Sequence, residues 1–198
     1  MSINPNEILT MEKHINKAKG KVLVLGLGLG YFAYMISSKK DVEKVIIIEN
    51  DNAIINLFKK HILNQFENKD KILIVHDDAF NYLKNNKGYD MVFADIWHDA
   101  NDGIASFIKL KEIEGKLNIP FMYWIDTSLF AMVRRCIVTI LVEHLENDNP
   151  RYDVNKDEMD KVINTIYFKI KDLKLNTKED IHNLLSDEYI DKLLKNRL

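Results

Sequence analysis

Three glycines at alternate positions follow the first apolar segment of the sequence, and they are its first candidate for ligand binding. They lie in Gly26-Leu27-Gly28-Leu29-Gly30, directly after residues 22–25. Glycine is favoured where the backbone turns with positive φ or where a ligand must approach the backbone closely. A strand, a glycine-rich turn and a helix are typical of nucleotide-binding βαβ units, although a tight turn without a ligand would give the same pattern.

An acidic residue stands where such a unit would place one. Glu49 ends the second apolar segment, 19 residues beyond Gly30, and an acid roughly 20 residues after the glycines binds the ribose hydroxyls in these units. Glu49 and the adjacent Asn50 are therefore candidate cofactor-binding residues, with a solvated strand-end carboxylate as the alternative. The glycine spacing G-x-G-x-G, in place of G-x-G-x-x-G, disfavours a dinucleotide such as NAD.

Two further candidates follow the third apolar segment, residues 72–75. The carboxylate of Asp78 could accept a hydrogen bond from the amino group of an adenine ring. Ala79 is small and could offer its backbone N–H to the same ring. Both residues therefore join Gly26, Gly28 and Gly30 as expected contacts of an adenosine-containing cofactor.

The residues after the fourth apolar segment are the candidates for chemistry on an acceptor. Asp95 could orient or deprotonate the acceptor and is also a candidate cofactor-binding residue, with a helix N-cap as the alternative. His98 could act as a base near neutral pH or simply hydrogen-bond a loop. Trp97 could cover the donor pocket or stack on the acceptor, or it could be an aromatic residue at the core edge. Asp99 and Asp102 would favour a cationic acceptor, but a solvated loop would have the same sequence.

These residues are expected at one edge of a parallel sheet. Five short apolar segments alternate with helical patterns, which predicts a Rossmann-like, doubly wound, mostly parallel α/β sheet with helices on both faces. The apolar segments are residues 21–25, 45–48, 72–75, 91–94 and 121–125, and the helical patterns are residues 31–37, 53–62, 80–83, 104–113 and 127–146.

We expect three parts along the chain. Residues 1–17 form an N-terminal helix, residues 18–148 form the cofactor-binding domain, and residues 149–198 form a C-terminal helical extension of the same domain. Within the extension, the apolar spacing predicts helices over residues 157–171 and 178–194. Asn147-Asp148-Asn149-Pro150 is typical of a helix end.

Composition excludes several classes of protein. The chain has 198 residues, 28 basic and 30 acidic side chains and a net charge of −2, so binding of nucleic acid by bulk charge is not indicated. Its longest nearly apolar run, residues 22–36, is shorter than the roughly 20 residues of a membrane span. The single cysteine, Cys136, lies on an apolar helical stripe; one cysteine and no visible secretory signal favour a cytoplasmic location. No metal site is predicted, although Asp95 and Asp126 could together help to hold Mg²⁺.

Four segments in order resemble the class I S-adenosylmethionine-dependent methyltransferases, and among them the spermidine-synthase-like branch. The segments are residues 22–30, 45–51, 78–83 and 89–95. The resemblance implies a seven-stranded sheet with a final antiparallel hairpin, and S-adenosyl-L-methionine lying across the carboxyl ends of the first strands. It also implies that Glu49 binds the ribose and that Asp78 and Ala79 contact the adenine.

The leading expectation is a methyltransferase that acts on a small or peripheral acceptor, which the sequence does not identify and which could be cationic. The aminopropyltransferases of the branch carry two serines and then Asp-Pro after the fourth strand, whereas this chain reads Asp95-Ile96-Trp97-His98-Asp99. A spermidine-synthase-like aminopropyltransferase, a non-catalytic cofactor-binding or interaction protein, and a nicotinamide-dependent oxidoreductase remain as alternatives. The helical segments could supply the surface of a homodimer.

Overall fold

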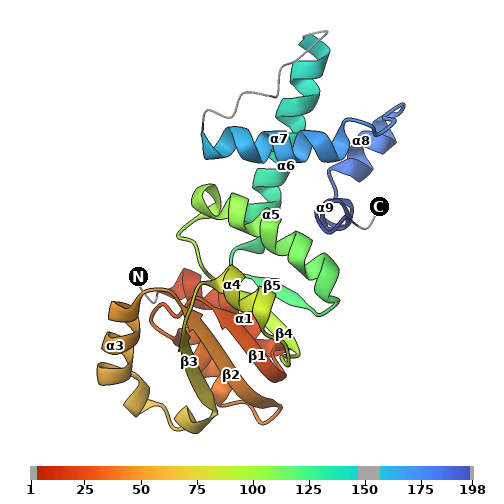
Figure 1. Cartoon of the computed structure of the whole chain (residues 1–198). Coiled ribbons are helices and arrows are strands. Elements are labelled where there is room, and N and C mark those ends of the chain that lie inside the picture. Colours follow the sequence, from red (N-terminus) through yellow and green to blue (C-terminus); the bar gives the residue numbers. More distant parts are fainter. Residues whose placement is uncertain (1–3, 147–156, 197–198) are drawn as a thin grey trace. The chain divides into compact units, whose positions relative to one another are not determined.

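The computed structural model describes residues 4–146 and 157–196, and within them it forms one five-stranded sheet and nine α-helices (Figure 1). The strands are β1 (Gly20–Leu25), β2 (Val42–Glu49), β3 (Ile72–His76), β4 (Met91–Ala94) and β5 (Phe121–Tyr123). Their order is β3-β2-β1-β4-β5, and every neighbouring pair is parallel. The predicted Rossmann-like α/β fold is therefore confirmed. The seven-stranded sheet with an antiparallel hairpin is wrong for the described residues, which contain no sixth or seventh strand.

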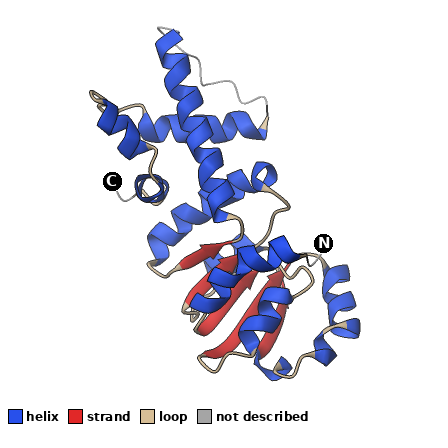
Figure 2. Cartoon of the chain, turned by 180° about the vertical axis from the view of Figure 1, so that it is seen from behind, coloured by secondary structure: helices blue, strands red, loops and turns tan. Residues whose placement is uncertain are grey.

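The helices alternate with these strands and then continue alone. They are α1 (Pro5–Lys17), α2 (Tyr31–Ser37), α3 (Asn52–His61), α4 (Ala79–Asn85), α5 (Ala100–Leu117), α6 (Asp126–Glu146), α7 (Glu158–Ile170), α8 (Lys178–Leu184) and α9 (Asp187–Leu194). Figure 1 shows α4 on the near side of the sheet, and the opposite view in Figure 2 shows helices in front of the strands on the other side. The predicted helix end at residues 147–150 lies outside the described residues.

One predicted helix is in fact two. The expected continuous helix over residues 178–194 is interrupted between α8 and α9. The Ser186 hydroxyl accepts a hydrogen bond from the backbone N–H of Tyr189 at 3.2 Å, and so caps the first turn of α9. Serine is among the preferred N-cap residues, because its oxygen replaces a missing helical acceptor. The apolar spacing continues across this break, and it therefore concealed the interruption.

The chain separates into two compact units. The first contains residues 1–96 and 119–124, and so holds the whole sheet with α1 to α4; the second contains residues 97–118 and 125–198, with α5 to α9. The sequence placed α5 and α6 with the sheet, in residues 18–148. The structure groups both helices with the C-terminal ones.

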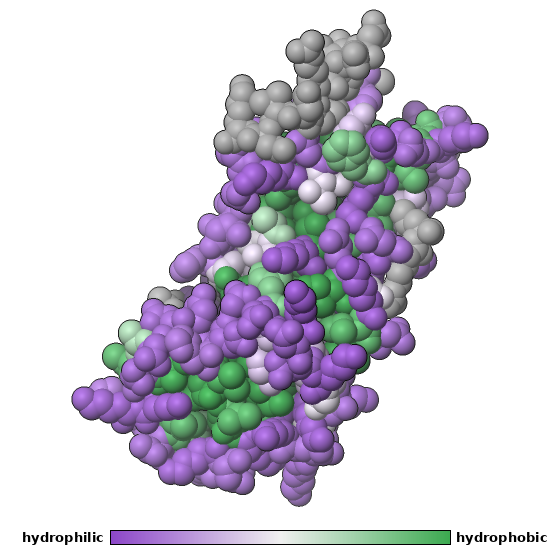
Figure 3. Space-filling view, viewed as in Figure 1, coloured by the Kyte–Doolittle hydropathy of each residue, from purple (hydrophilic) through white to green (hydrophobic). Residues whose placement is uncertain are grey.

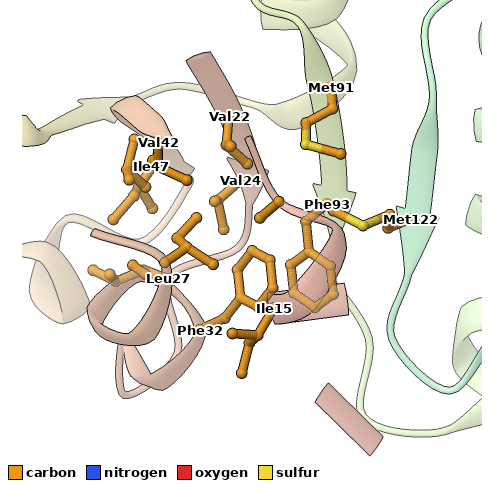
Figure 4. Close-up of a cluster of buried hydrophobic side chains, with 14 of the residues drawn as sticks. Ile15, Val22, Val24, Leu27, Phe32, Val42, Ile47, Met91, Phe93 and Met122 are labelled. Carbon is orange, nitrogen blue, oxygen red and sulfur yellow. The ribbon is translucent and has the colours of Figure 1, made fainter. Parts of the chain in front are cut away.

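One buried hydrophobic cluster of the first unit lies on one face of its sheet. Side chains of β1, β2, β4 and β5 point to that face at alternate positions, as the pleat of a strand requires. They pack against apolar residues of α1, α2 and α3. Figure 4 shows this cluster, in which the Phe32 ring of α2 stacks on the Phe93 ring of β4 with centroids 3.7 Å apart. The strand residues that point the other way, including Leu23, Leu25 and Val92, are also buried, as expected for a parallel sheet.

The second unit has a helical core. Leu129, Val133, Ile137 and Ile140 form a buried stripe along α6, as the 3.6-residue period of the sequence predicts. Cys136 is buried beside them, and burial raises the pKa of its thiol, which fits the predicted packing role. Among the described residues, no helix is both long enough and apolar enough to cross a membrane.

The sheet has two edge strands, β3 and β5. In Figure 3, hydrophobic colour reaches the surface in the lower part of the view, where Figure 1 draws β2 and β3. The edge strand β3 carries the exposed side chain of Leu73. The sheet is therefore less covered at its β3 edge than at its centre, where β1 is fully flanked.

Candidate active site

The glycine loop joins β1 to α2 and has left-handed backbone at all three glycines. The φ angles are 92° at Gly26, 53° at Gly28 and 76° at Gly30. The N–H of Gly26 donates to the carbonyl of Ile48 at 2.9 Å, which continues the pairing of β1 with β2 into the loop. A Cβ atom on Gly30 would lie 2.4 Å from the ring of Phe58. Glycine is thus required here by the backbone itself, whether or not a ligand binds.

Glu49 connects this loop to the end of β2. Its side chain is buried, with 8% of its surface exposed. One carboxylate oxygen accepts the N–H of Leu27 at 3.0 Å, and the other accepts the N–H of Asp51 at 2.8 Å. An ionised carboxylate has about four lone-pair positions. Each oxygen of Glu49 can therefore still accept one hydrogen bond from a hydroxyl group. This arrangement suits a ribose with two vicinal hydroxyls.

The other predicted cofactor residues lie at the ends of β2 and β3. The Asn50 carbonyl is 3.0 Å from Nε2 of His76, and the Asn50 side chain is exposed. Asp78 caps α4, because its carboxylate accepts the N–H of Asn81 at 2.9 Å. Ala79 is the first residue of α4, so no helical carbonyl can accept its N–H.

These residues share one edge of the sheet. The N–H of Asp77 donates to the Glu49 carbonyl at 3.2 Å, and the N–H of Asp95 donates to the Leu25 carbonyl at 2.9 Å. In parallel α/β sheets, ligands bind at the carboxyl ends of the strands, near the point where the strand order reverses. Here β1 is that point, since β2 lies on one side and β4 on the other. The first unit thus brings together the glycine loop, Glu49, Asp78 with Ala79, and Asp95.

The carboxyl group of Asp95 has a perturbed acidity. It follows β4 directly and is partly buried. Burial raises its pKa from 3.8 to about 7, and the negative charge of Glu7 adds to the effect. A carboxyl group with a pKa near neutrality can exchange protons at physiological pH, which an ordinary aspartate does poorly. The alternative role of Asp95 as a helix N-cap is wrong, because the N-cap of α5 is Asp99.

The predicted acceptor residues belong to the second unit, where they shape the start of α5. The Asp99 carboxylate accepts the N–H groups of Asn101 and Asp102 at 2.6 and 3.3 Å. The Asp102 carboxylate in turn accepts the N–H of Asp99 at 2.9 Å and lies 3.0 Å from Nδ1 of His98. Burial acts to raise the pKa of Asp102, but these hydrogen bonds outweigh it and lower the pKa. Both carboxylates therefore stabilise the helix start.

Trp97 and His98 differ in exposure. The His98 ring is exposed, whereas Trp97 is buried. The indole lies against Gly103 on the first turn of α5, where a Cβ atom would be 2.8 Å from its Cγ atom. The expected roles of Trp97, His98, Asp99 and Asp102 toward an acceptor stay predictions. Among the described residues, no group of three or more His, Cys, Asp or Glu side chains is arranged to hold a metal ion.

Sequence reasoning missed Glu7. The pattern Asn4-Pro5-Asn6-Glu7 is a capping box, and the structure contains both of its hydrogen bonds. That pattern predicts the start of α1, but it carries no signal for a place beside Asp95. Only the packing of α1 on the sheet brings the two carboxylates near each other.

Comparison with known proteins identifies the family of this chain. Residues 3–108 match the family model described as the spermine/spermidine synthase domain. The match covers more than half of the chain, so the chain belongs to this family. The resemblance to the spermidine-synthase-like branch is thereby confirmed.

Individual relatives match a shorter stretch. A polyamine aminopropyltransferase from Aeropyrum pernix is 29% identical over 97 residues, which cover 46% of this chain and 31% of that protein. A polyamine aminopropyltransferase from Leptospira interrogans is 36% identical over 87 residues, which cover 41% of this chain and 18% of that protein. The chain thus spans less than a third of the length of these two curated relatives.

Among solved structures, the spermidine synthase of Thermotoga maritima aligns with a TM-score of 0.40 and 20% identity, over 52% of this chain and 38% of that chain.

Proposed function

We propose that this protein is a transferase that moves an aminopropyl group from decarboxylated S-adenosylmethionine to an amine. The observation that carries the transfer chemistry of this proposal is Asp95, an acid at the carboxyl end of β4 whose pKa is raised to about 7, and the family indicates which group is moved. Membership of the spermine/spermidine synthase family supports it, as do two relatives named polyamine aminopropyltransferase. These findings favour aminopropyl transfer over the methyl transfer that the sequence first suggested.

In this proposal the first unit holds the donor. Glu49 accepts hydrogen bonds from the two ribose hydroxyls, and its bonds to Leu27 and Asp51 fix the direction of its carboxylate. Asp78 and Ala79 contact the adenine, and the left-handed backbone at Gly28 turns the loop across the carboxyl end of β1. The sulfonium then lies toward β4, on the side of Asp95.

The donor supplies a carbon that is activated by positive sulfur, and the protein has to align the nucleophile and manage one proton. At neutral pH an alkyl amine is an ammonium ion and has no lone pair for attack. Transfer of one proton to the Asp95 carboxylate frees that lone pair. Nitrogen then attacks the carbon, the C–N bond forms, and the electron pair of the C–S bond stays on sulfur as a neutral thioether. Asp95 afterwards releases its proton to water.

Methyl transfer from S-adenosyl-L-methionine is the second candidate. It is favoured by the residues after β4, which read Asp95-Ile96-Trp97-His98-Asp99 where the aminopropyltransferases have two serines and Asp-Pro. The same binding residues and the same proton acceptor serve either reaction. The two donors differ by one carboxylate, so donor preference separates the candidates.

The test is calorimetric titration of the protein with decarboxylated S-adenosylmethionine, S-adenosyl-L-methionine and NAD, followed by product analysis with a small amine acceptor. Tighter binding of the decarboxylated donor, with transfer of the aminopropyl group, is the expected result. Preference for S-adenosyl-L-methionine with a methylated product would replace the proposal by methyl transfer. Binding of a donor without any turnover would indicate a non-catalytic cofactor-binding protein, and binding of NAD alone would indicate an oxidoreductase.

A further inference from the structure

One face of helix α1 contacts Phe93 of β4 and Trp124, the residue after β5. The ring of His14 lies 5.5 Å from the ring of Phe93, between centroids, and Ile15 belongs to the same buried cluster (Figure 4). One turn earlier, the Thr10 hydroxyl accepts the indole N–H of Trp124 at 3.1 Å. The backbone N–H of Trp124 in turn donates to the carbonyl of Ala94, the last residue of β4, at 2.9 Å. Toward its N-terminus, α1 therefore approaches the carboxyl end of β4.

Glu7 is the next residue on this face. Residues 7, 10 and 14 are spaced by three and four positions, and such residues lie one above the other on a helix. His14 contacts Phe93, and Thr10 contacts Trp124, which is hydrogen-bonded to Ala94. Residue 7 therefore lies at the level of Asp95. The negative charge of Glu7 is accordingly the one that acts on Asp95. The capping box with Asn4 fixes where the Glu7 side chain begins.

Among the residues that the structure describes, Glu7 is the charged side chain that acts on the acidity of Asp95. The end of β1 contributes Leu25 and Gly26, and the end of β5 contributes the phenol of Tyr123 and the indole of Trp124. From α1, His14 is buried against Phe93, and Lys17, three residues further along the same face, is exposed in the last turn of the helix.

We propose that Glu7 is a positioning residue of the transfer reaction, which keeps Asp95 ready to take a proton from a cationic acceptor. This inference rests on the proposed role of Asp95. Two carboxylates cannot both ionise as easily as one, because each charge opposes the other. A negative Glu7 therefore makes the protonated form of Asp95 more stable, and so draws the proton from the acceptor ammonium. The acceptor nitrogen keeps the freed lone pair and forms the new C–N bond.

The test uses Glu7→Gln, a substitution that removes the charge but keeps the helix start, since glutamine also serves at this position of a capping box. Glu12→Gln is the matched control, because Glu12 is an exposed acid on the same helix. In wild-type protein, kcat at saturating acceptor should rise with pH as Asp95 loses its proton. In Glu7→Gln the midpoint of that rise should move to lower pH by roughly 0.5 to 1 unit. In Glu12→Gln it should stay in place. An unmoved midpoint in an active Glu7→Gln protein would overturn the inference while leaving the proposed function intact.

A second readout needs no turnover. The free energy of unfolding, measured by urea denaturation between pH 4 and 8, reports the acidity of Asp95 directly. In wild type the free energy of unfolding falls as the pH rises toward the raised pKa of Asp95. Glu7→Gln should lower the upper end of this pH range, and it should have no such effect in an Asp95→Asn background. If wild-type protein transfers no group from any donor, the proposed function fails and this measurement alone decides the coupling. An equal effect of Glu7→Gln with and without Asp95 would show that the two residues do not interact.

Discussion

The backbone at Gly26 passes so close to the residue after β4 that a Cβ atom on residue 26 would lie 2.0 Å from the carbonyl oxygen of Asp95. The glycine loop and Asp95 are thus held together by direct backbone contact at the carboxyl ends of β1 and β4. Two motifs that are far apart in the sequence form one rigid corner of the site. The glycine is needed for this approach, and a nucleotide is not required to explain it.

Gly26→Ala tests this contact, and Gly88→Ala is its control. Both residues have a φ angle of 92°, but nothing lies within 4 Å of a Cβ atom at position 88. Alanine should cost about 1 to 2 kcal/mol at either position, because left-handed backbone strains any residue with a Cβ atom. Gly26→Ala should lose at least about 2 kcal/mol more and should bind the donor poorly. Urea denaturation measures the difference, and equal losses would contradict the close approach.

Glu49→Ala should weaken donor binding by roughly 10- to 100-fold, since hydrogen bonds to a charged group contribute about 1.5 to 3 kcal/mol. The loss arises from the ribose contacts and from release of the loop at Leu27. Glu43→Ala removes an exposed acid from the same strand and should leave the affinity unchanged. Calorimetric titration with decarboxylated S-adenosylmethionine compares the two variants. A Glu49→Ala protein with wild-type affinity would exclude this residue from the donor site.

The sequence was sufficient to predict the five parallel strands and the edge at which the candidate residues lie, because both depend on local signals. The sixth and seventh strands came from the family resemblance, and the described residues do not contain them. Short apolar segments that end in Glu49, His76 or Asp95 mark where parallel strands stop, and parallel strands bring their carboxyl ends to one edge. The helix boundary at Ser186 was also visible as a cap, but the continuing apolar spacing outweighed it.

Two features near the end of β4 were not predicted, and the reasons differ. Asp99-Ala100-Asn101-Asp102 follows the capping-box spacing, so the role of these acids at the start of α5 could have been inferred from sequence. The two acids Asp99 and Asp102 were interpreted instead as favouring a cationic acceptor. The nearness of Glu7 to Asp95 could not have been inferred, since it depends on how α1 packs against β4 and β5 and leaves no periodic pattern of its own.

Asp95→Asn should abolish turnover with donor affinity nearly unchanged, and it should alter the pH dependence of stability. Folding raises the pKa of Asp95 from 3.8 to about 7, so between these values the folded protein holds the proton more tightly than the unfolded chain. The free energy of unfolding therefore falls as pH rises from about 4 to 7. Removing this titration should make Asp95→Asn more stable than wild type at pH 8, by roughly 2 to 4 kcal/mol. Thermal unfolding at pH 5 and pH 8 is the measurement, and a wild-type pH dependence in the variant would contradict the raised pKa.

The second unit carries a closed ring of four charges that should be critical for its stability. Nζ of Lys111 lies 3.1 Å from Glu114 and 2.7 Å from Asp191, and Nζ of Lys195 lies 2.8 and 2.7 Å from the same two acids. Lys111 and Glu114 are 4% and 7% exposed. Burial acts to raise the pKa of Asp191, but the two lysines outweigh it and lower the pKa. The ring therefore stabilises the fold at pH values above the ordinary pKa of aspartate. This contribution is lost as the pH falls through the lowered pKa of Asp191.

Lys111→Met should destabilise the protein by about 3 to 5 kcal/mol, because removing one partner leaves buried acids without enough positive charge. Lys192→Met, on α9, is the control. Lys192 forms an exposed pair with Glu188 at 2.8 Å, and such pairs contribute little because water screens them. Urea denaturation at neutral pH compares the variants. Because Asp191 becomes protonated in acid, the difference between Lys111→Met and wild type should shrink toward pH 3. A difference that stays constant over this range would mean that packing of the lysine stem, and not its charge, holds α5 and α9 together.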